Sequence, residues 1–327
     1  MDLLRLSPQM SYDGSLSMCG VHVRLVLTGL LMIVGCRSTP PVEDPVPKDT
    51  APPAPIRVVA IGDVHGDAGA ARSALHLAEV MDDKDQWIGG KTVVVQLGDQ
   101  LDRGDDEQEI LDLFEQLRTQ AAAAGGNFYP LLGNHETMNV QLDLRYVTDG
   151  GFADFADTSY SEDDAMVMSY PESQRGRVAA FRPGGTYAKI LAAHPMILQF
   201  EGTIFVHGGV LPAHLDTGID AINEQTAAWM RGEGDEPQVL QASDSPVWSR
   251  HFSKDTDEED CTLLDEVLSR TNAKRMVVAH TVQEGINAGC DNKVWRVDVG
   301  LAAYYGGTPE VLEIVDGKVS VLGPTAP

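Results

Sequence analysis

Short apolar runs alternate with amphipathic segments in the part of the chain that follows residue 55. The runs at 57–61, 91–97 and 127–132 are short and rich in Val and Leu, which is typical of buried strands. Between them, 68–81 and 107–124 carry apolar side chains at helical spacing, which predicts one helix in each interval. The order strand, helix, strand, helix, strand predicts a parallel sheet.

The alternation breaks between residues 140 and 200, a segment rich in Tyr, Asp and Gly with irregular helical stretches. We interpret it as an insertion or cap over a site, a common place for substrate selection. Beyond it, the pattern predicts a helical region to about residue 231, an acidic loop, and strands at 203–206, 275–278, 293–299, 310–315 and 318–322, the last two joined by a turn at Asp316-Gly317.

Composition places the chain among globular proteins and excludes one class of partner. Of its 327 residues, 43% are hydrophobic, so one large domain or two small ones could bury a substantial core. The formal net charge is −25, and no basic run interrupts it. Nucleic-acid binding relies on clusters of Lys and Arg, so we expect no nucleic acid as partner.

The N-terminal segment is predicted to be removed. An apolar run at 25–35 follows His22 and Arg24, and it is shorter than the ~20 residues that span a bilayer. It ends in Ile-Val-Gly-Cys36, which resembles the lipobox of bacterial lipoproteins and implies cleavage before Cys36 and lipidation of its thiol. The alternative is an ordinary secretory signal with a chance cysteine.

This interpretation divides the chain into a signal peptide at 1–35, a lipidated Cys36 with a Pro-rich tether to residue 55, and a globular body at 56–327. The body would then lie on the periplasmic face of a bacterial cell envelope and touch membrane only through its lipid. By the same resemblance, Arg37 rather than Asp after the cysteine favours the outer membrane. Cys261 and Cys290 remain as a pair in an oxidising compartment, either bridged or as two separate thiols.

Side chains that can bind a metal come directly after three of the predicted strands. Each strand ends in Gly, and the blocks Gly-Asp-Val-His-Gly-Asp (62–67), Gly-Asp-Gln-Leu-Asp-Arg-Gly (98–104) and Gly-Asn-His-Glu (133–136) come next. Ligand sites of α/β proteins gather at the carboxyl ends of strands, where Gly permits close backbone approach. Two later strands deliver a histidine each, so the candidate ligands are Asp63, His65, Asp99, Asn134, His207 and His280.

This donor set suits two divalent cations of the Mn, Fe or Zn kind, with Mn the first choice. It has too few oxygens for Ca and too many imidazoles for Mg. Six ligands exceed what one four-coordinate cation uses, whereas two cations about 3.5–4 Å apart could share one carboxylate. Asp99 is the natural bridge, because it alone in the central block directly follows the strand.

Such a site would be positive and would suit a phosphomonoester dianion. The cations would lower the pKa of a bridging water, and the resulting hydroxide would attack phosphorus in line. His135 could protonate the leaving group as general acid, with Asp102 orienting its imidazole. Arg103 could hold the phosphoryl oxygens in a bidentate grip.

These blocks resemble the signature of the phosphoprotein phosphatase branch of calcineurin-like metallophosphoesterases. Phe-Val-His207-Gly-Gly, Pro-Val-Trp-Ser-Arg250 and Val-Val-Ala-His280-Thr-Val-Gln resemble its bacterial Shewanella-like subgroup. The resemblance implies an α/β fold, a four-layer β-sandwich of two mixed sheets flanked by helices, with the cap at 140–200. It also implies a dinuclear centre that dephosphorylates phosphorylated Ser, Thr or Tyr of proteins, in this subgroup often with a tyrosine preference.

By the same resemblance, Asp63, His65 and His280 hold the first metal, Asp99 bridges, and Asn134 and His207 hold the second. His135 and Asp102 match the acid pair, and Arg103 matches the phosphate clamp, with Asn134 also near the phosphate. Arg250 is the candidate for a second phosphate-binding arginine. Its alternative is a surface arginine beside Trp248.

Two other functions compete with a phosphoprotein phosphatase. One is a small-molecule metallophosphoesterase, such as a dinucleoside polyphosphate hydrolase or a nucleotidase. The other is a non-catalytic phosphopeptide-binding module, which the intact His135, Asp102 and Arg103 argue against. We expect Glu136 to brace its loop and Glu107 to be a loop charge or a helix-start charge. We expect the acidic run at 255–260 to be a solvated face.

Overall fold

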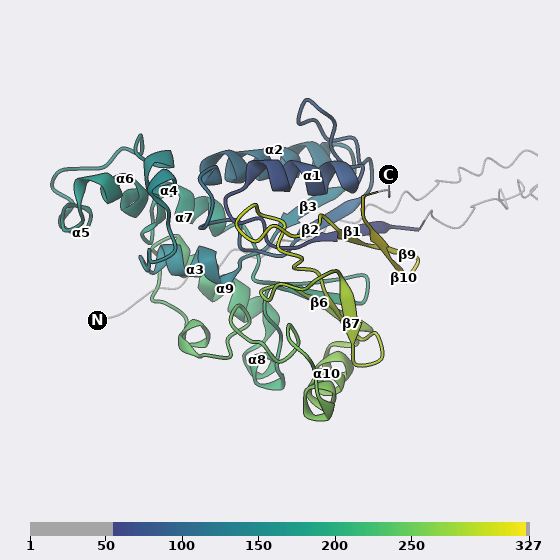
Figure 1. Ribbon diagram of the computed structural model, residues 1–327. Helices are drawn as coiled ribbons and strands as arrows, with labels where there is room; N and C mark the ends of the chain where they lie inside the picture. The colour runs from purple at the N-terminus through teal and green to yellow at the C-terminus, as the bar shows by residue number, and fades with distance from the viewer. Residues whose placement is uncertain (1–54, 325–327) are drawn as a thin grey trace, which may run out of the picture. The chain divides into compact units, whose positions relative to one another are not determined.

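The computed structural model describes residues 55–324 (Figure 1). The predicted signal peptide, Cys36 and the tether up to residue 54 lie outside the described residues, as do 325–327. Among the helices of 55–324, none combines the length and the apolar character that a bilayer crossing requires.

The first sheet has five strands in the order β10-β9-β1-β2-β3. Its parallel strands are β1 (Arg57–Ile61), β2 (Val93–Gln96) and β3 (Asn127–Pro130). The hairpin of β9 (Val311–Val315) and β10 (Lys318–Leu322) adds to β1 in antiparallel register. Helices α1 (Ala68–Leu77) and α2 (Glu107–Ala123) lie together on one face of this sheet (Figure 1).

The second sheet also has five strands, in the order β4-β5-β6-β8-β7. The inner strands β5 (Thr203–Val206), β6 (Arg275–Val278) and β8 (Val294–Arg296) are parallel. The edge strand β4 (Ile197–Phe200) is antiparallel to β5, and the edge strand β7 (Asn287–Gly289) is antiparallel to β8. The connections contain α8 (Pro212–Thr217), α9 (Ile219–Met230), a 3₁₀ turn at Gln238–Gln241, and α10 (Glu258–Thr271).

Three apolar clusters separate four layers. One lies between the two sheets and includes Val58, Val95, Phe205 and Val277. A second packs α1 and α2 on the first sheet, and a third packs the helices of the second half on the second sheet. The predicted α/β fold of two mixed sheets flanked by helices is therefore confirmed.

The segment at 140–200 is partly helical and begins at the end of α3 (Asn134–Val140). It contains α4 (Asp149–Asp154), α5 (Ala165–Met168), α6 (Glu172–Phe181) and α7 (Thr186–Leu191), which gather beside α3 in Figure 1. Phe155, Phe181 and Tyr187 join the apolar cluster of the second sheet. The cap, by which we mean α4–α7 and their loops, is thus packed on the body.

Several predicted bounds were wrong, for local reasons. The helix expected over 68–81 ends at Leu77, because Glu79 adopts a left-handed backbone with φ +53°. The strands expected at 91–97 and 293–299 are shorter, at Val93–Gln96 and Val294–Arg296. The sequence pattern missed the short edge strands β4 and β7.

The acidic run at 255–260 begins a helix that the pattern did not predict. Asp257 is the N-cap of α10, and its carboxylate accepts hydrogen bonds from the amides of Glu259 and Asp260. Acidic side chains in a first turn face the positive end of the helix dipole. Farther along α10, Cys261 forms a disulfide with Cys290, which follows β7.

Candidate metal centre

The predicted ligands converge because each stands where a strand ends. Asp63 and His65 follow β1, Asp99 follows β2, and Asn134 opens α3 after β3; His207 and His280 follow β5 and β6. Parallel strands present their carboxyl ends at one edge of their sheet, and the two sheets are packed on each other. All six residues are buried, with at most 8% of the surface exposed.

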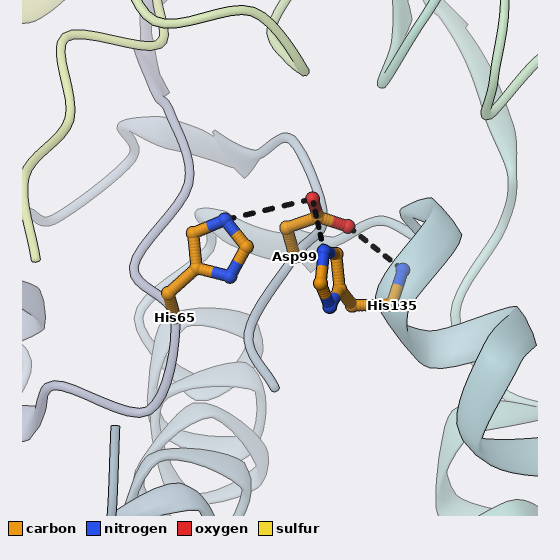
Figure 2. Close-up of side chains that lie close together, drawn as sticks. All are labelled: His65, Asp99 and His135. Carbon is orange, nitrogen blue, oxygen red and sulfur yellow. Dashed lines mark hydrogen bonds and ion pairs between the residues drawn. The ribbon is translucent and has the colours of Figure 1, made fainter. Parts of the chain in front are cut away.

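The carboxylate of Asp99 is the centre of the cluster. Its Oδ2 lies 3.2 Å from His207 Nε2 and 3.7 Å from His65 Nε2. His207 Nε2 in turn lies 3.0 Å from Asn134 Oδ1 and 3.1 Å from His280 Nδ1. Figure 2 shows His65 and His135 approaching the same Asp99 carboxylate from different segments.

Two groups of potential ligand atoms share Asp99. One is His65, Asp99 and His135, and the other is Asp99, His207 and His280. The resemblance assigned His280 to the same cation as Asp63 and His65, whereas the geometry places it beside His207. Asp63 lies between the groups, with Oδ2 3.9 Å from His65 Nε2 and Oδ1 3.6 Å from His207 Nδ1.

The loops that carry these side chains are held in left-handed backbone conformations. His65, Asp99 and His280 have φ values of +41°, +51° and +68°. Such values cost a non-glycine residue energy, so surrounding contacts must fix them. Glu136 holds the Asp99 loop and the turn after β3, because its carboxylate accepts hydrogen bonds from the amides of Gly133, Asp99, Gln100 and Leu101. The expected bracing role of Glu136 is therefore visible in the structure.

The electrostatics of the cluster fit divalent cations. Burial lowers the pKa of His65 to about 4 and that of His280 to about 2, which keeps both imidazoles uncharged with a lone pair to donate. Burial, together with Asp298 and Asp99, raises the pKa of Asp63 well above its usual range. Asp63 Oδ1 and His280 Nε2 are buried without hydrogen-bond partners in the described chain, and a cation would satisfy such atoms.

His135 pairs with Asp102 at the margin of the cluster. Its Nδ1 lies 2.5 Å from Asp102 Oδ2, and its Nε2 lies 3.9 Å from Asp99 Oδ2. Burial lowers the pKa of His135, but the charges of Asp99 and Asp102 outweigh this effect, so the net shift is upward. The imidazole can therefore hold a proton on Nε2 that faces the cluster.

Two arginines stand at the rim. The Arg103 guanidinium stacks between Tyr146 and Tyr304, with its Cζ 4.0 Å and 5.0 Å from the two ring centroids. Arg250 is exposed and donates from Nη1 to Thr281 Oγ1 at 2.6 Å and to the His280 carbonyl at 3.4 Å. Both predicted phosphate-binding arginines thus lie beside candidate ligands or the acid pair.

Residues 56–284 match the family described as calcineurin-like phosphoesterase. The chain belongs to this family. It is 38% identical to Shewanella-like protein phosphatase 2 of Arabidopsis thaliana, over 80% of this chain and 75% of the relative.

Solved structures support the family at the level of the fold. A cold-active protein-tyrosine phosphatase of a psychrophilic Shewanella species aligns with TM-score 0.62 and 25% identity, covering 82% of this chain and 80% of that one. A mutant form of a cold-active protein tyrosine phosphatase aligns over the same shares with TM-score 0.65 and 26% identity. The resemblance to Shewanella-like phosphatases that the motifs indicated is therefore confirmed, and it extends over about 80% of the chain.

Sequence reasoning missed several residues that contact the site. Glu107 was expected to be a loop or helix-start charge, and it does begin α2, but its complete burial and its pairing with Arg177 of the cap were not predicted. Asp298 is buried beside Asp63, and its position in the sequence follows the short strand β8. Asp298 could have been found by the rule that located His280, since it lies two residues past a strand, whereas Arg177 has no local signal.

We predict that Asp99→Asn removes most bound metal. The substitution deletes a charge at the only carboxylate shared by both ligand groups, so we expect less than half of the wild-type metal content and a loss of activity of about 10²-fold or more. Metal analysis of purified protein measures the first effect. Asp106→Asn, an exposed residue with the same change of charge, is the control and should retain its metal. Wild-type metal content in Asp99→Asn would contradict the shared-ligand arrangement.

Proposed function

We propose that this chain is a metal-dependent phosphomonoester hydrolase that acts on phosphoproteins. The observation that carries the proposal is the His135–Asp102 pair, whose free Nε2 faces a buried cluster of two carboxylates and three further imidazoles. A proton donor beside a cation site is the arrangement that phosphoester cleavage requires. The family assignment supports the same reaction class.

The ligand set we propose is Asp63, His65, Asp99, Asn134, His207 and His280. Two divalent cations held there, with Mn preferred over Fe or Zn, would supply Lewis-acid chemistry and acidify water. The chain's own residues do the rest. His135 donates its Nε2 proton to the leaving oxygen while Asp102 fixes the ring through Nδ1, and Arg103, Asn134 and Arg250 bind phosphoryl oxygens.

The surroundings of Arg103 favour an aromatic leaving group. Tyr146 and Tyr304 flank its guanidinium, and Tyr305 packs against Tyr304 with ring centroids 4.8 Å apart. Tyr304 and Tyr305 are 60% and 39% exposed, so their faces are available to a substrate. A cavity of about 350 Å³ beside Arg103 and Tyr304 could accept the chain around a phosphorylated residue. Relatives named as protein tyrosine phosphatases point the same way.

We expect phosphotyrosine peptides to be hydrolysed with a higher kcat/KM than phosphoserine peptides, by about two- to tenfold, because an aromatic ring gains about 0.5–1.5 kcal/mol against tyrosine faces. Parallel assays of the two peptides and diadenosine polyphosphate, with the same metal, test this. Tyr304→Leu should reduce the ratio of kcat/KM between the phosphotyrosine and the phosphoserine peptide. If only the diadenosine polyphosphate were hydrolysed, the substrate would be a small molecule and not a phosphoprotein.

His135→Ala should have little effect on kcat for substrates with good leaving groups. Without the acid, esters of alcohols should lose about 10²-fold or more in kcat, whereas 4-nitrophenyl phosphate, whose leaving group needs no proton, should lose much less. A series of aryl and alkyl phosphates gives the comparison, and metal analysis confirms that the ligands are intact. Equal losses across the series would argue against an acid role for His135.

We also propose that the protein is a lipoprotein of the cell envelope. The apolar run at 25–35, Cys36 and the Pro-rich tether support this, and the Cys261–Cys290 disulfide suits an oxidising compartment. Cys36→Ser should shift the protein from the membrane fraction to the soluble fraction in a bacterial host, while Cys19→Ser should not. Equal membrane association of both variants would contradict a lipid on Cys36.

A further inference from the structure

The cap contributes one charged side chain to the interior next to the acid pair. Arg177 lies in α6 and has no exposed surface, although Arg is rarely buried completely. Its guanidinium lies 5.1 Å from the ring centroid of Phe155 and 5.0 Å from that of Phe181, both cap residues. A guanidinium that is buried away from water needs a hydrogen-bond acceptor for each of its N–H groups.

All the donor positions of Arg177 are used. Nε donates to Asn139 Oδ1 at 2.9 Å, and Nη1 donates to Glu107 Oε2 and to the Gly151 carbonyl. Nη2 donates to Glu107 Oε1 at 2.9 Å and to Asp102 Oδ1 at 3.2 Å. An arginine has five N–H groups, and each has an acceptor here. A lysine in this place could not reproduce the fork.

These contacts fix the carboxylate of Asp102 from the side opposite His135. Asp102 Oδ1 accepts from Arg177 Nη2 and from Asn139 Nδ2 at 3.1 Å, and Asn139 is itself held by Arg177. The backbone amide of Asp102 donates to Glu107, the main ion partner of Arg177. The other oxygen, Oδ2, is thereby left for His135 Nδ1. Rotation of the Asp102 carboxylate would break contacts at both oxygens.

We propose that Arg177 is a positioning residue for the leaving-group acid, and that the packing of the cap sets the orientation of the Asp102–His135 pair. The proposal rests on the acid role proposed for His135. Arg177 does not reach the reacting atoms, and it acts through Asp102. An ion pair that served only to anchor the cap would need Glu107 alone, without the contacts to Asp102 and Asn139.

Arg177→Lys tests the proposal in the full chain. We expect kcat on alkyl phosphates to fall about 10²-fold, kcat on 4-nitrophenyl phosphate to fall less than about fivefold, and KM and metal content to stay within about twofold, because only proton donation is impaired. Arg182→Lys is the matched control. Arg182 is the C-cap of the same helix and pairs with Asp164 of the cap, away from Asp102, so its leaving-group dependence should stay that of the wild type.

Asn139→Ala gives a second measurement in case Arg177→Lys does not fold. It removes one donor from Asp102 Oδ1 and should produce the same selective loss at about 5–10-fold. In a His135→Ala background, neither substitution should change the leaving-group dependence further. Uniform losses on all substrates, or a further selective loss in that background, would overturn the proposal. If His135→Ala itself shows no selectivity, the acid role falls and the inference falls with it; if only the Arg177 and Asn139 variants lack selectivity, the acid role stands and the inference alone is wrong.

Discussion

The backbone and carboxylate of Asp99 join three loops of the first sheet, and the site depends on this junction. Its carbonyl accepts hydrogen bonds from the amides of Val64 and His65, in the loop after β1. Its amide donates to Glu136 and its Oδ1 accepts from the amide of His135, both after β3. Oδ2 remains for the ligand cluster. The position of each candidate ligand in these loops therefore depends on one residue after β2.

This junction requires close backbone approach and buried charge, which are both costly. Gly98 has φ +92°, and a Cβ there would lie 2.4 Å from the Gly133 amide nitrogen, so no larger residue fits between the loops. Asp63, Asp99 and Asp298 are nearly completely buried, and isolated carboxylates are unstable in such surroundings. The apolar clusters on both faces of each sheet must offset this cost, and bound cations would remove much of it.

The sequence indicated those parts of the site that are formed by short continuous segments. The blocks around Asp63, Asp99 and Asn134 are continuous, each directly after an apolar strand, so their convergence followed from the rule for parallel sheets. His207 and His280 followed the same rule on the second sheet. The sequence could not show which of the other candidate ligands lies beside His280, because that depends on how the sheets pack, and the structure places His280 beside His207.

Contacts made across long sequence distances explain what the pattern missed. Edge strands β4 and β7 are four and three residues long and take their conformation from neighbours. Arg177 lies 75 residues from Asp102, within an insertion that has no regular period. The left-handed conformations of His65, Asp99 and His280 are imposed by the loops around them, because the modest preference of Asp and His for this region does not single out these positions.

Residues of the 140–200 insertion reach the His135–Asp102 pair from two sides. Tyr146 lies 5.2 Å from the His135 ring, centroid to centroid, and also stacks on Arg103 at the rim. Arg177 holds Asp102 from the interior. A shift of this insertion would therefore move the Tyr146 ring that stacks on Arg103 and loosen the Asp102 carboxylate that holds His135. Under the roles proposed for Arg103 and His135, changes in the sequence of this insertion would alter phosphate binding and proton transfer together, because both contacts come from it.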